Sequence, residues 1–401
     1  MTNQNTNKNK RIYFLDNAAT TAVRPEVISR MEKFLSKEYA NPASTYRFAN
    51  SVNEQINDAR VQVAVALGAA KAKEIYFTGS GTESDNWAIR GTADANAHKG
   101  RHIITTAFEH HAVMECCKNL EKHGFEVTYL MPDKNGFVTP AQVKEAIRPD
   151  TILISVIYAN NEIGTIQPIA EIGKIAKDAG IIFHTDAVQA AGHIPIDVVA
   201  ANIDLCSISA HKFYGPKGAG ALYIKTGTKI DPLIFGGMQE NNKRAGSHNT
   251  PGIIGMGLAL ELAVAEMEEE AVRLTRLRNK LIKGILNIPF TSLNGSQDMR
   301  LPGNVNVSFK FIESESVINL LDFKGICASS GSACNSELLE ASHVLIAIGL
   351  NHEETNGTVR FTLGKNNTEE DIDYVLEALP PIIEKLRNMS PLYEDFLRSR
   401  G

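Results

Sequence analysis

The chain has 401 residues, of which 43% are hydrophobic and 22% are charged, and its formal net charge is −5. This is the composition of an ordinary soluble globular protein, and the length exceeds what one simple core accommodates, so we expect two domains. The negative charge argues against a nucleic acid or an anionic membrane surface as a partner.

The cysteines and two segments of the chain bear on the cellular compartment. The five cysteines form an odd number without regular spacing, which argues against a disulfide framework. Their spacing matches no zinc or iron–sulfur ligand set, so we expect no metal. Residues 1–11 lack the apolar core of a secretory signal, and glycines and Glu261 break the apolar stretch 250–267, which favours a buried helix over a membrane span. We therefore predict a cytoplasmic protein.

Short elements open the chain. Residues 12–15 form an apolar run that leads into the polar stretch 16–21. Pro25 is placed to start a helix, which we expect to continue to about Tyr39. Ser51 is predicted to cap the next helix.

Strands and helices then alternate as far as about residue 267. The strands are expected at 74–78, 103–106, 127–131, 151–159, 181–184, 204–208 and 221–224. This alternation predicts the α/β class, with a mostly parallel, doubly wound sheet and helices on both of its faces.

The pattern changes beyond residue 267. A charged helical pattern comes first, and predicted strands at 304–309 and 359–363 alternate with helical patterns near 316–323 and 369–389. This is typical of a smaller α+β domain. We predict a large domain over 21–267 and a small domain over 268–401 that also includes residues 1–20, with a cleft between the two domains.

The stretch 207–218 holds the first candidate catalytic residue. A buried strand is predicted to end near Ile208, and Lys212 follows on a loop before a Gly/Pro turn. Proteins of the α/β class place their chemistry at such strand ends. A partly desolvated amine flanked by hydroxyls suits Schiff-base formation, although a lysine in a surface turn has the same local pattern.

Two other strand ends carry groups that suit a phosphate and a cation. Gly81 and Thr82 lie between a strand and a helix, where backbone N–H groups and the Thr hydroxyl can hold a phosphate, with a plain tight turn as the alternative. Asp186 ends an apolar strand, where an ionised carboxylate needs a cationic partner such as a pyridinium nitrogen. The alternative for Asp186 is a helix N-cap.

Three further polar residues are candidates for the same site. His110 follows a strand and could stack on an aromatic ring and move protons, or it could be a helix cap or a surface residue. Asn161 follows the most apolar strand, where an amide could bond a phenolic oxygen. Arg360 lies inside a predicted strand, where a guanidinium needs either a substrate carboxylate or a structural ion pair.

Cys334 is the candidate nucleophile. It lies in the Ser/Gly/Ala-rich segment 327–336, whose backbone is easily rearranged. A cysteine on an exposed loop can be nucleophilic, whereas one in a core is inert. We expect Cys327 to be buried and the remaining cysteines to be packing residues, namely Cys116, Cys117 and Cys206.

Together these stretches resemble the cysteine desulfurases of the NifS/IscS type, which are fold-type I pyridoxal-phosphate enzymes within the class V aminotransferase family. The matching stretches keep the family's order and cover nearly the whole chain. They are 15–21, 81–86, 109–110, 160–164, 184–189, 209–212 and 329–334.

The resemblance implies pyridoxal 5'-phosphate as the cofactor and a role for each matching residue. Lys212 would form the Schiff base and carry the α-proton of the substrate. Asp186 would pair with the pyridinium nitrogen, and His110 would stack on the ring. The other implied cofactor contacts are Asn161 and Gln189 for the phenolic oxygen, and Gly81, Thr82, Ser209 and His211 for the phosphate.

The resemblance also implies the reaction and the partners. Arg360 and Asn161 would bind the substrate L-cysteine, and Cys334 would take its sulfur as a persulfide while L-alanine leaves. A protein acceptor would then receive the sulfur for iron–sulfur cluster assembly or related sulfur trafficking. The enzyme would be a homodimer, in which Ser247 stands where the family usually has Thr and completes the phosphate site of the other subunit.

Two other functions compete with this hypothesis. A β-eliminating lyase or aminotransferase of the same fold, including a selenocysteine lyase, needs no cysteine nucleophile, so Cys334 argues against it. A catalytically silent sulfur-relay or assembly partner would keep only the fold, and the joint presence of Lys212, His110, Asp186 and Cys334 argues against that.

Overall fold

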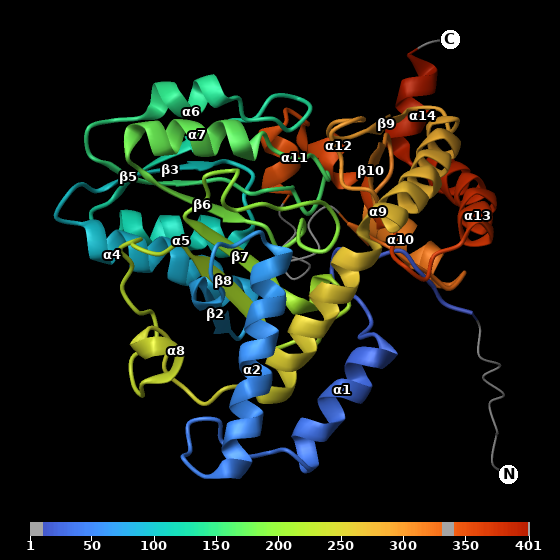
Figure 1. Ribbon diagram of the computed structural model, residues 1–401. Helices are drawn as coiled ribbons and strands as arrows, with labels where there is room; N and C mark the ends of the chain where they lie inside the picture. Colours follow the sequence, from blue (N-terminus) through green and yellow to red (C-terminus); the bar gives the residue numbers. More distant parts are fainter. Residues whose placement is uncertain (1–10, 331–340, 400–401) are drawn as a thin grey trace, which may run out of the picture.

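Two sheets, each with its own hydrophobic core, organise the computed structural model, which describes residues 11–330 and 341–399 (Figure 1). The larger sheet has seven strands in the order β2-β8-β7-β6-β5-β3-β4. Its strands are β2 Ile75–Thr78, β3 His102–Thr106, β4 Glu126–Leu130, β5 Thr151–Ser155, β6 Ile182–Asp186, β7 Leu205–Ser209 and β8 Gly220–Ile224.

Strand direction confirms the predicted doubly wound architecture. All neighbouring strands from β4 to β7 pair in parallel, whereas β8 pairs antiparallel with both β2 and β7. Figure 1 shows α6 and α7 on one face of this sheet and α4 and α5 on the other. The helical elements of this large unit after β2 are α3 Gly81–Asn86, η2 Trp87–Gly91, α4 Thr92–Asn96, α5 His111–Glu121, α6 Pro140–Ala146, α7 Ile169–Ala179, η3 Ala210–Lys212 and α8 Gln239–Asn242.

Local sequence signals set several helix ends in this unit. Thr139 and Gln142 form a capping box at the start of α6, and Pro140 occupies the first turn, where its missing N–H costs nothing. Gly180 closes α7 in the left-handed conformation, with φ of 67°. Capping residues in the sequence therefore fix the start of α6 and the end of α7. Because β5, β6 and β7 are parallel, their polar carboxyl ends lie at one edge of the sheet.

The small unit has an antiparallel sheet in the order β12-β13-β10-β9. Its strands are β9 Thr291–Leu293, β10 Asn304–Phe309, β12 Ser329–Ser330 and β13 Thr358–Thr362. A separate parallel pair joins β1 Tyr13–Phe14 to β11 Ile326–Cys327, and Leu15 packs in the small-unit core. The helices of the C-terminal part are α10 Ser314–Asp322, α11 His343–Ala347, α12 His352–Asn356, α13 Glu369–Asn388 and α14 Pro391–Arg398.

One helix, α9 Thr250–Leu286, connects the two cores. Met256 and Leu260 pack in the large-unit core, whereas Leu277 and Leu281 pack in the small-unit core. The boundary predicted at residue 267 falls inside this helix, and the domain bounds remain a prediction. By length and composition α9 could cross a membrane, but 56% of its most apolar window is buried inside the structure, as in a core helix.

The first two helices lie beside α9 (Figure 1). They are α1 Pro25–Ser36 and α2 Arg47–Ala66, preceding the short η1 Ala72–Glu74. The predicted cap at Ser51 is wrong, because α2 already begins at Arg47, after Tyr46. Ala49 and Val52 are buried together with Ala40, so packing of the first turns stabilises this earlier start.

Candidate active site

A cavity of about 260 Å³ opens at the edge of the large sheet where β6 and β7 end. It is lined from the large unit by Lys212 and Asp186, from the N-terminal segment by Ala18 and Ala19, and from the small unit by Arg360. The structure thus brings together ten residues that the sequence predicts for the site: Gly81, Thr82, His110, Asn161, Asp186, Gln189, Ser209, His211, Lys212 and Arg360.

Lys212 ends the η3 turn that follows β7. Its Nζ donates hydrogen bonds to the carbonyl oxygens of Ala18, at 2.5 Å, and of Ala19, at 2.8 Å. Its own carbonyl oxygen lies 2.9 Å from Nε2 of His193, which must carry the proton because a carbonyl can only accept. The amine is therefore held at the cavity wall, with its backbone fixed from behind.

Asp186 is 4% exposed at the end of β6. Its Oδ1 accepts a hydrogen bond from the backbone N–H of Val188 at 2.9 Å, within a turn. The helix N-cap alternative is wrong, because no helix begins in the described stretch between β6 and β7. Burial raises the pKa of Asp186 to about 6, although the Val188 N–H and the charge of Lys212 favour the ionised form. The carboxylate is thus an anion in a dry place, suited to a cationic partner.

His110 is the N-cap of α5 and not its first residue, because the helix begins at His111. Its Nδ1 accepts the N–H of Ala112 at 3.1 Å, so the proton of the neutral ring lies on Nε2. Burial, together with the charge of Lys212, lowers the pKa of His110 to about 4. The helix-cap interpretation is confirmed, and the ring also lines the cavity. Stacking on an aromatic ring stays a prediction.

The other end of the cavity suits a phosphate. Ser80 caps α3, and the first N–H groups of a helix have no partner within it. A Cβ added at Gly81 would lie 2.7 Å from Cγ2 of Val188, so only glycine allows this close approach of the backbone. Hydroxyl and imidazole donors from Thr82, Ser209 and His211 line the same cavity.

Arg360 of β13 forms the structural ion pair that was one of its two predicted roles. One Nη donates to Asp16 Oδ1 at 2.9 Å and the other to the carbonyl of Asn161 at 3.2 Å. Its Nε is buried and has no hydrogen-bond partner among the described residues. A structural ion pair therefore holds the guanidinium in place, and its Nε–H remains without a partner among the described residues.

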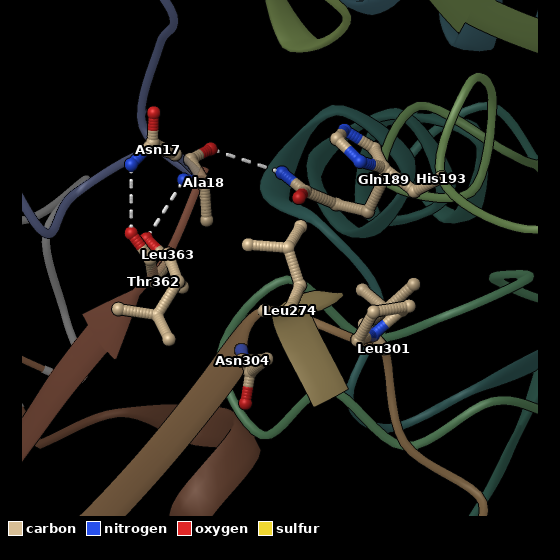
Figure 2. Close-up of a pocket in the computed structure, with 11 residues that line it drawn as sticks. Asn17, Ala18, Gln189, His193, Leu274, Leu301, Asn304, Thr362 and Leu363 are labelled. Atoms are coloured by element: carbon tan, nitrogen blue, oxygen red, sulfur yellow. Dashed lines mark hydrogen bonds between the residues drawn. The ribbon is translucent and has the colours of Figure 1, made fainter. Parts of the chain in front are cut away.

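A smaller pocket of about 30 Å³ adjoins the cavity at the seam between the two units (Figure 2). Figure 2 shows the amide of Gln189 donating to the carbonyl of Ala18, at 3.0 Å. Asn17 and Ala18 in turn bond Thr362 of β13. The N-terminal segment thus contacts both units, and its Ala18 carbonyl also accepts a hydrogen bond from Lys212.

The predicted nucleophile Cys334 lies outside the described residues, but both flanks of its segment reach the site. Ser329 pairs with Arg360 in the small sheet. On the other side, Oγ of Ser342 donates to Oε2 of Glu162 at 2.6 Å, and His343 bonds the carbonyl of Glu109. Ser329 is therefore held beside a residue that lines the cavity, and Ser342 and His343 are held by Glu162 and Glu109, each next in sequence to a residue that lines it.

Some expectations need correction or addition. Cys327 is partly exposed and not buried, whereas Cys116, Cys117 and Cys206 are buried as expected. Ser247 is exposed and does not line the cavity of its own chain. Sequence reasoning assigned no role to Asp85, although this carboxyl lines the cavity, and the only signal was its place in the stretch 81–86.

Comparison with known proteins agrees with this geometry. The model of the family "aminotransferase class-V" matches residues 13–375. The cysteine desulfurase IscS of Methanosarcina thermophila is 58% identical over 96% of this chain and 95% of its own length. That of Clostridium botulinum is 55% identical over 98% of this chain and 99% of its own length.

Solved structures give the same result. A NifS-like protein is 38% identical over 94% of this chain and 100% of its own, with a TM-score of 0.88. SspA in complex with cysteine is 39% identical over 87% of this chain and 98% of its own, with a TM-score of 0.78. The chain belongs to the class-V aminotransferase family. Within it the chain is placed among the cysteine desulfurases of the NifS/IscS type, which depend on pyridoxal 5'-phosphate.

The residues that line the cavity fit this cofactor, independently of the comparisons. The buried anion of Asp186 suits a cationic ring nitrogen, and the neutral ring of His110 suits an aromatic face. The close approach at Gly81 and the donors around it suit a phosphate. Lys212 supplies the amine that an aldehyde requires.

Proposed function

We propose that this chain transfers the sulfur of L-cysteine to Cys334 and releases L-alanine, with each residue of the cavity in the role given below. The observation that carries the proposal is the meeting of three groups in one cavity. These are the amine of Lys212, the buried carboxylate of Asp186 and the partly unpaired guanidinium of Arg360. Their distinct chemistry matches an amino-acid substrate on an electron-withdrawing cofactor.

The cofactor would be held at five points. Lys212 would bind its aldehyde group and Asp186 its ring nitrogen, while His110 would cover one face of the ring. Asn161 and Gln189 would contact the phenolic oxygen, and the phosphate would be held by Gly81, Thr82, Ser209 and His211. When bound, pyridoxal phosphate supplies an aldehyde that condenses with amines and a ring that accepts electron density from the substrate carbon.

The protein's own groups then bind the substrate and move its protons. The free Nε of Arg360 would donate to the substrate carboxylate, while Asp16 and the Asn161 carbonyl keep the guanidinium oriented. Once displaced from the aldehyde, the Lys212 amine would take the α-proton and return it to the product. Ala18 and Ala19, whose carbonyls accept from Nζ, set the position of this amine.

Cys334 would take the sulfur itself. Its thiolate attacks the sulfur of the bound cysteine, the C–S bond breaks, and a new S–S bond forms. The electron pair of the C–S bond stays with the substrate carbon, which gains a proton and becomes the methyl group of alanine. No external oxidant or reductant is needed, because one thiol becomes a persulfide while one carbon is reduced.

A pair of cysteine variants tests the assignment. Cys334→Ala should abolish the formation of L-alanine and sulfide from L-cysteine in the presence of a reductant. Cys327→Ala, seven residues earlier and partly exposed on β11, is the matched control and should retain the activity. Undiminished sulfide release by Cys334→Ala, with pyruvate in place of alanine, would show a β-eliminating lyase instead.

We propose further that the enzyme is a cytoplasmic homodimer that passes its persulfide sulfur to a protein acceptor for iron–sulfur cluster assembly or related trafficking. Support for the dimer comes from Ser247, which is exposed on its own chain and available to a second subunit. Light scattering tests the mass, and Ser247→Ala should weaken cofactor binding. A monomer with full cofactor affinity would refute the dimer.

A further inference from the structure

Asp85 is a second buried carboxyl beside Asp186, and the proposed reaction does not use it. It lies on α3 with 1% of its surface exposed, and it lines the cavity. Carboxylate oxygens of Asp85 and Asp186 and a ring nitrogen of His110 lie within 4.8 Å of one another. Oδ1 of Asp85 has no hydrogen-bond partner among the described residues.

The sheet register explains what Asp85 covers. His184 of β6 pairs with Ser155 of β5 and with Leu205 of β7. Two residues further along β6, Asp186 pairs with Ser207. His184 and Asp186 are two residues apart on one strand and therefore point to the same face of the sheet. Asp85 approaches this face from α3, with its Oδ1 3.6 Å from Nε2 of His184.

His184 does not neutralise Asp85 by carrying a proton. The imidazole is fully buried, and its two nitrogens already bond Ser155 Oγ at 2.8 Å and Ser207 Oγ at 3.0 Å. Burial lowers the pKa of His184 to about 3, which leaves the ring neutral. If both His184 and Asp85 were charged, the pair would lose the hydration energy of two ions, and at 3.6 Å no direct hydrogen bond would compensate for that loss.

Two carboxyls this close in a dry site cannot both be ionised, so one proton is retained between them. The surroundings decide which carboxyl holds it. Asp186 accepts the Val188 N–H and feels the charge of Lys212, and both favour its anion. Among the described residues no cation contributes in this way to Asp85. Burial together with the charge of Asp186 raises its pKa well above the usual range, although a hydrogen bond from Ser207 opposes this.

We propose that Asp85 is a positioning residue that stays protonated in the folded protein, so that Asp186 carries the only negative charge of the pair. The titratable groups that surround Asp85 are Asp186, His184, Glu109, His110, Lys212, Cys116 and Cys206.

The consequence concerns the balance of charge. One carboxylate matches one pyridinium, whereas two would leave an unpaired anion in the cavity. This consequence rests on the proposed function, but the protonation of Asp85 itself does not, because it follows from the protein's own groups. The tests below therefore use the cofactor-free full chain and can fail independently of any activity.

The first test is infrared difference spectroscopy of protein labelled with carbon-13 at its aspartate carboxyls. The difference between wild type and Asp85→Asn at neutral pH should contain the carbonyl stretch of a protonated aspartic acid. The label separates this aspartate signal from that of Glu109. Burial raises the pKa of Glu109 to about 8, so this residue is also protonated at neutral pH. Absence of a protonated aspartate, or its persistence in Asp85→Asn, would overturn the proposal.

The second test is linkage between folding and pH. The folded pKa of Asp85 is raised, so its stabilising contribution is present below the unfolded pKa and is lost as pH rises. Asp85→Asn lacks this loss, and the ratio of its folding constant to that of wild type should rise by up to about tenfold per pH unit from pH 5 to pH 7. A merely structural role predicts a constant ratio, which would contradict the proposal. Asp94→Asn, at an exposed position of α4, is the control and should show a nearly constant ratio.

Discussion

At the scale of single residues, the cavity combines groups that stabilise opposite charges within a few ångströms. Among the described residues that line it, Lys212 supplies the only amine and Arg360 the only guanidinium. Each is oriented by main-chain oxygens: Ala18 and Ala19 hold the amine, and Asn161 holds the guanidinium. Asp16 also pairs with Arg360, at 2.9 Å, so main-chain oxygens and one carboxylate together fix the two cations at the cavity wall.

Removal of the Lys212 amine should slow catalysis strongly without unfolding the protein. Lys212→Ala is expected to lower the rate of alanine formation by about 10²-fold to 10⁴-fold, the usual contribution of a positioned proton carrier. Lys217→Ala, five residues later and exposed, is the matched control. If both variants kept the wild-type rate, another group would have to move the proton.

The guanidinium of Arg360 should act mainly on substrate binding. Arg360→Lys keeps the charge but loses the planar fork that reaches Asp16, Asn161 and the substrate together. A charged hydrogen bond contributes about 1.5–3 kcal/mol, so KM for L-cysteine should rise at least about 10-fold, with a smaller change in kcat. Arg90→Lys on the exposed side of η2 should change neither, and a fall in kcat alone for Arg360→Lys would contradict a binding role.

At the scale of elements, the loop after β5 connects the site to the start of α11. Glu162 is 6% exposed, and its Oε2 accepts the hydroxyl of Ser342, the residue that caps α11. Burial raises the pKa of Glu162 to about 7, and the Ser342 hydrogen bond and the Arg360 charge offset this only in part. Burial therefore favours the protonated carboxyl, although the hydrogen bond from Ser342 is itself stronger to the carboxylate.

The buried Glu162 carboxyl should make the stability of the protein depend on pH. Because the folded pKa of Glu162 is raised, its stabilising contribution is fully present below the unfolded pKa and is lost as pH rises through about 7. Glu162→Gln should therefore gain about 2 kcal/mol in free energy of unfolding relative to wild type between pH 5 and pH 8. Urea titrations at both pH values measure it, with exposed Glu171→Gln on α7 as the control. If the free energies of unfolding of Glu162→Gln and wild type differed by the same amount at both pH values, the raised pKa of Glu162 would be refuted.

Sequence patterns sufficed where chemistry follows directly from a strand end. Lys212 and Asp186 each follow an apolar run, and the parallel sheet brings the ends of β6 and β7 to one edge. Asp85 could not be found this way, because its position in α3 becomes informative only when the helix packs over His184. The start of α2 was missed for a similar reason: burial of Ala49 and Val52 outweighs the capping preference of Ser51.

At the scale of the whole molecule, two cores share one helix and one site. α9 runs from the large-unit core to the small-unit core, and the N-terminal segment returns to bond both units beside the cavity (Figures 1 and 2). The charged second half of α9 still buries Leu274, Leu277 and Leu281, which are spaced as one helical face. A ligand in the cavity therefore touches groups from both units at once.

The cofactor should accordingly stabilise the whole molecule. At a free concentration 100 times Kd, pyridoxal phosphate should raise the free energy of unfolding of the cofactor-free protein by about 2.7 kcal/mol. Pyridoxal at the same concentration lacks the phosphate that Gly81 and its neighbours would hold, so its effect should be smaller. Equal stabilisation by both compounds, measured by thermal unfolding, would show that the phosphate end of the cavity is wrongly assigned.

The most direct test of the sulfur transfer is mass spectrometry after a single turnover. Enzyme loaded with pyridoxal phosphate and mixed with less than one equivalent of L-cysteine, without reductant, should carry one extra sulfur atom on the peptide that contains Cys334, with one L-alanine formed per sulfur. Peptides that contain Cys116, Cys117, Cys206 and Cys327 should remain unmodified. Pyruvate and free sulfide with no sulfur on Cys334 would contradict the account.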